Sequence, residues 1–417
     1  MLSFDFFYDI RFWLMLVVVA LVYRLTAFNR VGKTVILLLS SVLMILALPR
    51  FNLISFAFLL AIGLLTYLAG YQLNTSDLSK STRKRTVLSF GGILFLILCL
   101  AFFKYRFFQS AVLGHLFPKS LAPTDYIFII GISYISFKMI HFLIEAYKQQ
   151  LKNLSLTNFV SYLFFFPAFI SGPINRYNHF SEQLAVTGVG NWRGDLRNGT
   201  ERIIHGLFKK VVLAAICLPY AIVNIGKPPS EMTWNEVILG LYAYTFYVYF
   251  DFSGYSDLAI GSARIMGIKL PENFNNPFLK PNIQQLWASW HMSLTRWLTD
   301  YIYWPLSKKL RGAEYLRKKP VLLSNISIIV TFIICGMWHG EPLNFVVWGL
   351  YHGFGLAILN VYQKQKRRIR DQRIKKYFLS RYSRWIGVVC TFNFFVLGIL
   401  LFSFDINSIR TLLVRMF

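Results

Sequence analysis

Long apolar stretches separated by short polar loops follow one another along almost the whole chain. A transmembrane helix needs about 20 largely apolar residues. Ten stretches approach or exceed that length: residues 12–28, 34–49, 51–72, 87–108, 126–146, 203–225, 236–262, 321–339, 343–361 and 385–404. The pattern predicts an all-α polytopic membrane protein with about ten transmembrane helices, forming a single integral-membrane domain over residues 1–417.

Basic residues between the stretches indicate the side on which each loop lies, because Lys and Arg concentrate in cytoplasmic loops. Basic clusters occur within residues 24–33, 80–85, 148–152, 193–210, 308–319 and 364–376. Placing all of them in the cytosol puts both termini outside. Acidic residues precede the first stretch and Arg24 follows it, which favours a retained first span over a cleavable signal.

Two further apolar segments, 157–173 and 284–306, have cytosolic charges on both sides and cannot cross under this topology. They are predicted to be re-entrant or interfacial. In the first segment, Pro167, Gly172 and Pro173 would interrupt a helix. Irregular backbone at membrane depth is tolerated only inside protein or around a cavity. The two segments therefore predict a central cavity or tunnel that opens to the cytosol.

Composition agrees with a membrane protein and removes other classes. The 417 residues include 44 Lys plus Arg and 18 Asp plus Glu, a net charge of +26, yet only 15% are charged and 56% are hydrophobic. Soluble proteins average about 25% charged residues. These values exclude a soluble globular enzyme, a disordered chain and a nucleic-acid binder. No motif with metal-ligand spacing occurs, so no metal site is predicted.

Ionisable residues inside apolar segments are costly and are functional candidates. They occur in FDFSGYSDLAIG with Asp251 and Asp257, around WASWHMSLTRWLTD with His291, and around CGMWHG with His339. The two aspartates are expected to pair with Arg264 or Arg296.

His339 is the strongest candidate for chemistry, because a neutral imidazole at the end of a span can accept a proton near neutral pH. Alternatively, it is a structural histidine bonded to a carbonyl at the helix end. His291 either positions a substrate or completes a hydrogen-bond network. For His352 a packing role is favoured. Other residues expected to be structural are Trp287, Trp290, Leu294 and Trp297, which form a stripe at helical spacing, and His115, His141, His179 and His205.

The predicted topology places His291 towards the cytosolic face and His339 near the outer face. Two histidines on opposite sides of a cavity suit a reaction whose donor and acceptor lie across the membrane. They also suit a proton-coupled transporter or a flippase of an envelope precursor, and this alternative stays open.

Residues 125–360 resemble the membrane-bound O-acyltransferases (MBOAT), whose marker is two histidines that each follow a tryptophan. Here these are His291 in WASWHMSL and His339 in CGMWHG. The resemblance implies that His339 is catalytic and that His291 is its partner. It implies a core over 125–360, N-terminal helices over 1–124, and a basic cytosolic loop and last helix over 361–417. Candidates to line the substrate tunnel are Trp290, Ser293, Trp338, Asn175, Arg176, Asp251 and Asp257.

Two bacterial branches of that family share segments with the chain. GISYISFKMIHFLIEAYK and FFPAFISGPINRY resemble the teichoic-acid D-alanyl transfer (DltB) branch, whereas YFDFSGYSDLAIGSARIMGIKLPENFNNPF resembles the alginate O-acetylase (AlgI) branch. Either branch implies transfer of a D-alanyl or acetyl group to hydroxyls of an exported cell-envelope polymer such as teichoic acid or polysaccharide.

The resemblance also implies the surroundings of the enzyme. It implies a bacterial cytoplasmic membrane, no permanently bound cofactor, and a thioester donor that is a phosphopantetheine carrier protein or acetyl-CoA. Basic patches 308–319 and 364–376 either attract this donor or only fix topology. The implied partners are the donor, membrane lipid and a membrane-anchored or secreted accessory transferase outside, with no nucleic acid.

Overall fold

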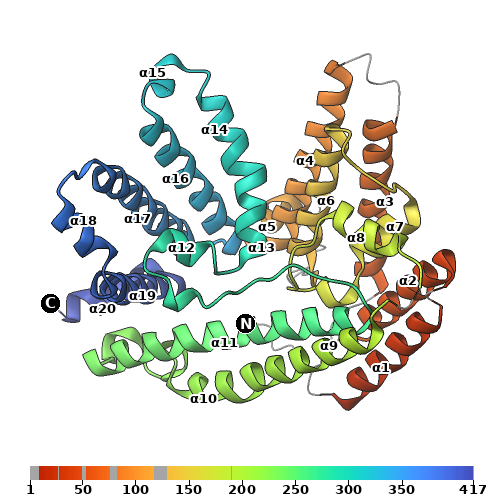
Figure 1. Ribbon diagram of the computed structural model, residues 1–417, viewed down its shortest axis with the longest axis horizontal. Helices are drawn as coiled ribbons and strands as arrows, with labels where there is room; N and C mark the ends of the chain where they lie inside the picture. The colour runs from red at the N-terminus through yellow and green to blue at the C-terminus, as the bar shows by residue number, and fades with distance from the viewer. Residues whose placement is uncertain are drawn as a thin grey trace. The chain divides into compact units, whose positions relative to one another are not determined.

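The computed structural model describes residues 9–26, 28–48, 53–75, 82–116, 129–188 and 190–416, and over these residues it contains helices but no strand. The chain forms two compact units (Figure 1). Unit 1 comprises Met1–Gly206 with Tyr255–Pro271, and unit 2 comprises Leu207–Gly254 with Glu272–Phe417. The division falls inside one long helix, α11 (Trp234–Ile265).

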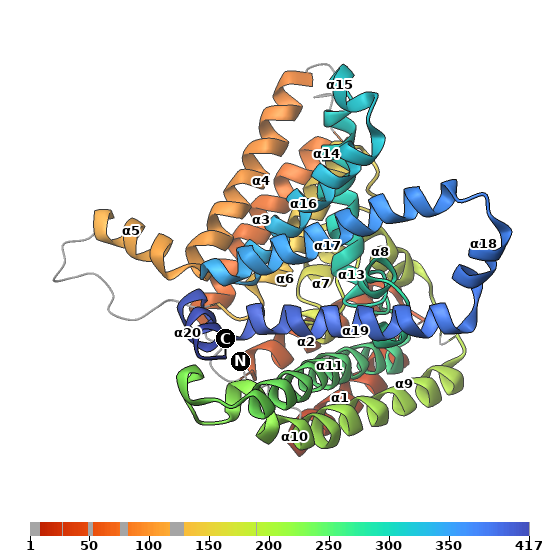
Figure 2. The same cartoon turned by 90° about the vertical axis from the view of Figure 1, so that its left-hand side faces the viewer.

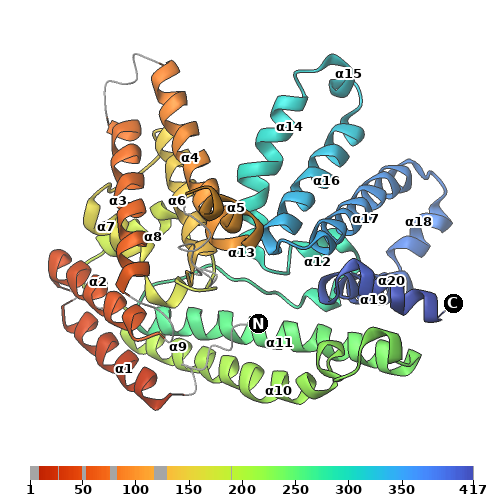
Figure 3. The ribbon, with the colours of Figure 1, turned by 180° about the vertical axis from the view of Figure 1, so that it is seen from behind.

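Unit 1 is built from nine α-helices among its described residues, and from the end of α11. Side-chain caps mark several helix starts: Asp9, Asn29 and Ser155 each accept a backbone N–H from the first turn that follows. The central helices α3, α4 and α6 lie side by side (Figures 1 and 3). The helices are α1 (Ile10–Leu25), α2 (Arg30–Leu46), α3 (Leu53–Thr75), α4 (Thr82–Lys104), α5 (Arg106–Leu116), α6 (Ile132–Tyr147), α7 (Leu156–Leu163), α8 (Tyr177–Ala185) and α9 (Trp192–Leu207).

Unit 2 holds most of the C-terminal half of the chain. A π-helical turn, Phe208–Leu213, continues α9 into α10 (Ala214–Cys217), and α11 follows. Later helices include a hairpin, α16 and α17, and a long pair, α17 and α19, joined by the short α18 (Figure 2). They are α12 (Ile283–Trp287), α13 (Met292–Leu298), α14 (Trp304–Leu310), α15 (Glu314–Arg317), α16 (Pro320–His339), α17 (Leu343–Arg368), α18 (Gln372–Leu379), α19 (Arg381–Ser403) and α20 (Ile406–Met416).

Six helical stretches among the described residues are long and apolar enough to cross a membrane: Leu53–Thr75, Thr82–Lys104, Trp192–Tyr220, Pro320–His339, Leu343–Arg368 and Arg381–Ser403. The chain is a multi-pass membrane protein, but ten crossings are not confirmed. The predicted span 87–108 corresponds to α4, which ends at Lys104. The predicted span 203–225 overlaps the helical stretch Trp192–Tyr220, which begins earlier. The start of the predicted span 126–146 lies outside the described residues, and α6 begins at Ile132.

Both segments that were predicted not to cross are interrupted helices. The first has only the eight residues of α7 and a 3₁₀ turn at Phe166–Ala168 before the irregular stretch that contains Gly172 and Pro173. The second breaks between α12 and α13 and then continues through a π-helical turn, Thr299–Tyr303, into α14. The interruption predicted for the first segment is thus confirmed, and the break in the second was not predicted. The return of either segment to the cytosol stays a prediction.

Several basic residues that were used to assign loops to the cytosol have structural partners instead. The Lys33 ammonium is buried in α2 and donates to the carbonyl oxygens of Gln183 and Val186, the latter at 3.0 Å. The Arg24 guanidinium donates to Ile265 O, at the end of α11, and forms an ion pair with Asp195. These cations stabilise helix ends, so they are weak indicators of sidedness.

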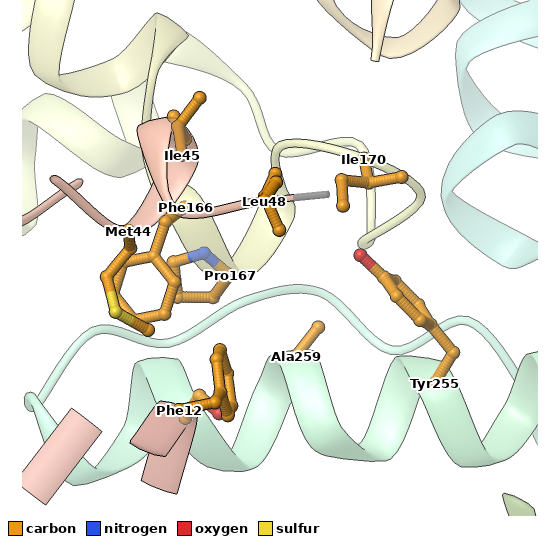
Figure 4. A pocket seen from close by; sticks show the side chains of 10 residues that line it. Phe12, Met44, Ile45, Leu48, Phe166, Pro167, Ile170, Tyr255 and Ala259 are labelled. Carbon is orange, nitrogen blue, oxygen red and sulfur yellow. The ribbon is translucent and has the colours of Figure 1, made fainter. Parts of the chain in front are cut away.

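A small cavity lies within unit 1, beneath the broken segment (Figure 4). The 3₁₀ turn contributes Phe166 and Pro167 and the irregular stretch after it contributes Ile170, while Tyr255 and Ala259 come from α11. The Tyr255 hydroxyl reaches the stretch and accepts the backbone N–H of Ser171 at 3.3 Å. Apolar packing and one hydroxyl therefore hold this side of the loop.

Glycines set the close approach of α16 to α17 within unit 2. A Cβ at Gly349 would lie 2.3 Å from the carbonyl oxygen of Phe332, and one at Gly336 would lie 2.1 Å from that of Phe345. Both obstacles are backbone atoms, which cannot rotate away. Since His339 ends α16, the two glycines fix its position relative to α17.

We predict that Gly349→Ala will lower the unfolding free energy by about 1–3 kcal/mol, because the methyl group must push two packed helices apart. Thermal unfolding in detergent measures the effect. Gly91→Ala is the matched control: this helical glycine has nothing within 4 Å of the added Cβ. Alanine there should be neutral or stabilise by roughly 0.5–1 kcal/mol. Equal effects of the two substitutions would contradict the close-packing argument.

Candidate functional site

His291 is held in an unusual backbone conformation at the break between α12 and α13. It is the N-cap residue of α13, with φ 42° and ψ 52° in the left-handed region. Few residues other than glycine adopt this region, although histidine does so more often than most, and a residue held there costs about 1–3 kcal/mol. Such strain persists only where surrounding contacts enforce it, and it is often found at functional sites.

Asn273 supplies the contacts that enforce this turn. It is fully buried, and its Oδ1 accepts the Ser293 hydroxyl at 2.6 Å and the Ser293 backbone N–H at 3.2 Å. Its own carbonyl oxygen accepts the backbone N–H of Met292 at 2.9 Å. The first N–H groups of α13 would otherwise be unsatisfied. Asn273 thus caps α13 in place of the His291 side chain, whose imidazole is left for other contacts.

The His291 imidazole is buried among aromatic rings, with the edge of Phe252 at a centroid distance of 4.7 Å and Trp338 at 6.5 Å. Burial lowers the pKa of His291 to about 3, because the charged form would lose its hydration. His291 is therefore neutral at physiological pH and can serve as a hydrogen-bond donor or acceptor without carrying charge.

His339 is half-buried at the C-terminal end of α16. Trp348 and Phe402 each present a ring at a centroid distance of 5.1 Å, nearly perpendicular to the imidazole. Trp338 lies on another side, at 4.7 Å from His339. Because Trp338 also contacts His291, the indole ring of Trp338 lies next to both histidines within unit 2.

The remaining candidates divide between the two units. Ser293 and Trp338 lie beside the histidines, while Trp290 packs among rings that include Phe274 and Phe395. Also in unit 2, Asp251 forms an ion pair with the buried Lys210. The other three candidates, Asn175, Arg176 and Asp257, belong to unit 1.

The pairing expected for the two aspartates is wrong. Asp257 accepts from Arg202 Nε at 2.6 Å, and Asp251 pairs with Lys210. Arg264 instead pairs with Asp195 at 2.9 Å. Sequence separation alone could not indicate these partners, because Arg202 and Lys210 come from α9 and the π-helical turn that follows it, about 50 residues earlier in the chain.

The tryptophan stripe is not on one helix, because the chain breaks between α12 and α13; Trp287 therefore precedes the break and Trp297 follows it. Both are nonetheless buried, as the packing interpretation predicted. His352 is buried too, with Trp287 at 5.0 Å and Trp348 at 4.8 Å between ring centroids. Its surroundings support the packing role.

Helix α6 holds both ends of the broken segment in unit 1. The buried Lys138 ammonium donates to the carbonyl oxygens of Tyr162 and Leu163, at the end of α7. One turn later, His141 Nε2 accepts the backbone N–H of Tyr177, at the start of α8. This contact confirms the structural role predicted for His141. Lys138 is a residue that the sequence analysis missed.

Asn175 shapes the turn between that segment and α8. Its Oδ1 lies 2.9 Å from the backbone N of Arg176, which donates, and 2.9 Å from His179 Nδ1. Burial lowers the pKa of His179, which favours the neutral ring. The Tyr162 hydroxyl donates to Asn175 O at 3.0 Å. Asn175 is thus a structural residue of the loop, and the Arg176 side chain is exposed.

A family comparison gives the site its context. The model of the membrane-bound O-acyltransferase family matches residues 45–401, which include both motif histidines. The chain belongs to the membrane-bound O-acyltransferase family. It is therefore an O-acyltransferase, and the transporter alternative is not needed to explain its buried polar residues.

Relatives of this family member act on different envelope polymers. It is 34% identical over 290 residues to the teichoic acid D-alanyltransferase of Bacillus subtilis, covering 67% of this chain and 70% of the relative. It is 30% identical over 303 residues to a probable alginate O-acetylase of Azotobacter vinelandii, covering 72% and 58% respectively. It is also 30% identical over 331 residues to the peptidoglycan O-acetyltransferase of Helicobacter pylori, covering 73% and 59%.

Among the residues that the structure describes, no group of three or more His, Cys, Asp or Glu side chains is arranged to hold a metal ion. The polar groups that are seen beside the two histidines of this O-acyltransferase include the Trp338 indole, the Asn273 amide and the Ser293 hydroxyl. These groups donate and accept hydrogen bonds and protons.

We predict that Asn273→Leu will disorder the His291 turn, because it removes the acceptor for two groups of Ser293. Leaving buried donors unsatisfied costs about 1–3 kcal/mol, so the apparent melting temperature should fall. Asn275→Ala, two residues away on an exposed side chain, is the control and should leave the melting temperature unchanged. A stable Asn273→Leu protein with the parent rate would show that the turn does not depend on this amide.

We predict that Lys138→Met will destabilise unit 1 by about 1–3 kcal/mol, because two buried carbonyl oxygens lose their donor. Lys152→Met removes an exposed lysine that pairs with Glu182, and surface pairs contribute about 0–1 kcal/mol. Protease accessibility of the 164–176 stretch, compared between the two variants, measures the effect locally. The cap assignment is wrong if both variants are cleaved at the parent rate.

Proposed function

We propose that the enzyme moves an acyl group from a thioester donor on the cytosolic side to hydroxyl groups of an exported cell-envelope polymer, in a bacterial cytoplasmic membrane. The observation that carries the proposal is the pair of aromatic-enclosed histidines that both lie next to Trp338. The names of the relatives support the reaction class, since all three transfer an acyl group to an envelope polymer.

His339 is the proposed general base. Its half-exposed imidazole accepts the proton of the acceptor hydroxyl while the hydroxyl oxygen attacks the thioester carbonyl. The new C–O bond forms as the C–S bond breaks, and the proton passes from the imidazole to the departing thiolate. The products are an ester and a free thiol. General-base assistance of this kind contributes about 10²–10⁴-fold to a rate.

His291 is the proposed partner of His339 rather than a second base. A pKa of about 3 makes it a poor proton acceptor, but a neutral imidazole can still hydrogen-bond the thioester or the acceptor. Its strained backbone and the Asn273 cap hold this ring in one orientation. Fixed donors of this kind stabilise developing charge without having to reorganise during the reaction.

The aromatic rings around His339 have a chemical consequence. Trp348, Phe402 and Trp338 limit access of water, and a thioester exposed to water would be lost to hydrolysis. The donor is proposed to be a phosphopantetheine carrier protein or acetyl-CoA. Both are anionic, and the basic cluster at 308–319 offers them a positive surface.

D-alanine is the acyl group to test first. The chain covers 70% of the length of the Bacillus subtilis D-alanyltransferase but 58–59% of the two O-acetyl-transferring relatives. A separate membrane-anchored or secreted transferase outside is proposed to complete delivery to the polymer. An acetyl donor, tested in parallel, separates the two branches.

The deciding experiment is His339→Ala, reconstituted with a labelled thioester donor and a hydroxyl acceptor. Ester formation should fall by about 10²–10⁴-fold or more while the protein stays folded, because the reaction loses its base. His115→Ala, an exposed histidine on α5, is the control and should retain the parent rate. Ester formation by His339→Ala at the parent rate would refute the mechanism. Transport of an unchanged substrate without ester would favour the carrier alternative.

A further inference from the structure

A cleft within unit 2 lies where the end of α17 meets α18. It has a volume of about 450 Å³ and is lined by Gln363, Lys366 and Arg367 on α17 and by Phe378 and Leu379 on α18. The Lys366 ammonium lies 4.4 Å from the centre of the Phe378 ring, a cation–π contact that holds this charge at the cleft. One wall is therefore cationic and the other apolar.

The chain segment that forms this α17–α18 cleft is strongly basic. Asp371 is the one acidic residue between positions 362 and 386, and its carboxylate accepts the backbone N–H groups of Arg373 and Ile374 as the N-cap of α18. That carboxylate is thus committed to the helix start. The basic residues of the segment are Lys364, Lys366, Arg367, Arg368, Arg370, Arg373, Lys375, Lys376, Arg381 and Arg384.

Large apolar side chains beside the cleft are exposed. Leu379 is 84% exposed and Tyr382 is 81% exposed, and Tyr377 and Trp385 are more than half exposed. Basic residues mixed with exposed aromatic and aliphatic side chains are typical of helices that lie in the surface of a membrane. Tyrosine and tryptophan are enriched at that depth.

The connectivity places the cleft at the membrane surface. Both α17 and α19 are long and apolar enough to cross the bilayer, and α18 joins their ends (Figure 2). A link of a dozen residues, 369–380, cannot leave the vicinity of those ends. Phospholipid phosphates lie at this depth in a bilayer and are therefore within reach of the cleft.

We propose that the α17–α18 cleft binds an anionic phospholipid of the surrounding bilayer. Lys366 and Arg367 bind the phosphate of the headgroup, and Phe378 and Leu379 contact the glycerol and the first methylene groups of a chain. Inorganic phosphate would satisfy the cations but would leave the apolar wall uncovered. The wall therefore favours a lipid over a soluble anion. The proposed site is separate from the acyl-transfer chemistry and is independent of the proposed function.

Native mass spectrometry of the purified protein with added phosphatidylglycerol, phosphatidylcholine or inorganic phosphate tests the proposal. The Lys366→Gln/Arg367→Gln variant should bind the first phosphatidylglycerol at least fivefold more weakly, on the scale expected for cations near an anionic surface. Binding of phosphatidylcholine, whose choline cation offsets the phosphate charge, should weaken less than binding of phosphatidylglycerol. Leu379→Asn should also weaken phosphatidylglycerol binding but leave inorganic phosphate unaffected.

Arg373→Gln/Lys376→Gln is the matched control, because it removes two charges from exposed positions of α18 that do not line the cleft. It should change phosphatidylglycerol binding less than twofold. Equal weakening of phosphatidylglycerol binding by both double variants would mean that the whole basic segment attracts the lipid without a specific site. If inorganic phosphate competed as effectively as the lipid, the cleft would be a site for a soluble anion. Loss of binding to an acidic carrier protein, with lipid binding intact, would mean a protein-docking surface. Each of these results overturns the proposal, provided that thermal unfolding shows the variants to be folded.

Discussion

The satisfaction of backbone hydrogen bonds at broken helices is the constraint on which the rest of this structure depends. Each break exposes N–H and C=O groups that cannot be left unpaired in an apolar environment. Buried side chains from neighbouring elements form hydrogen bonds with these groups. Lys138 and His141 do so at the break after α7, and Asn273 does so at the break before α13. The histidine turn exists because such partners are present.

The same constraint explains why so many charges in an apolar chain are paired. An unpaired charge on a buried helix face would be costly in a low-dielectric environment. The ion pairs Asp257–Arg202 and Asp251–Lys210 neutralise such charges. Lys33 and Arg24 are satisfied by carbonyl oxygens. Counting basic residues to assign loops therefore mixes two populations: cations that stay at the surface, such as those around α18, and cations with structural partners.

The helical architecture and the first interruption could be predicted from sequence patterns, because both depend on local composition: apolar runs make helices, and Pro167 with Gly172 stops one. The break between α12 and α13 was not predicted. The patterns also indicated the two motif histidines through the family resemblance. The left-handed backbone at His291 could not be predicted, because nothing in WASWHMSL requires it. The turn is enforced by Asn273, about 20 residues earlier in the chain. The prediction of ion-pair partners for Asp251 and Asp257 was wrong for the same reason, since the pairing depends on how helices pack against one another.

Different contacts position the two histidines, so different substitutions displace each of them. His339 is positioned by glycine contacts between α16 and α17, so its location follows the packing of two helices. His291 is positioned by one amide and a strained residue, so its orientation follows a single hydrogen-bonded turn. Trp338, which contacts both rings, is the element that relates them. A change in helix packing therefore moves the proposed base, whereas a change at Asn273 reorients only its partner. If Gly349→Ala lowers the rate of ester formation, the cause is a shift of α16 against α17 that moves His339. If Asn273→Leu lowers it, the cause is a changed orientation of His291. Both histidines lie next to Trp338.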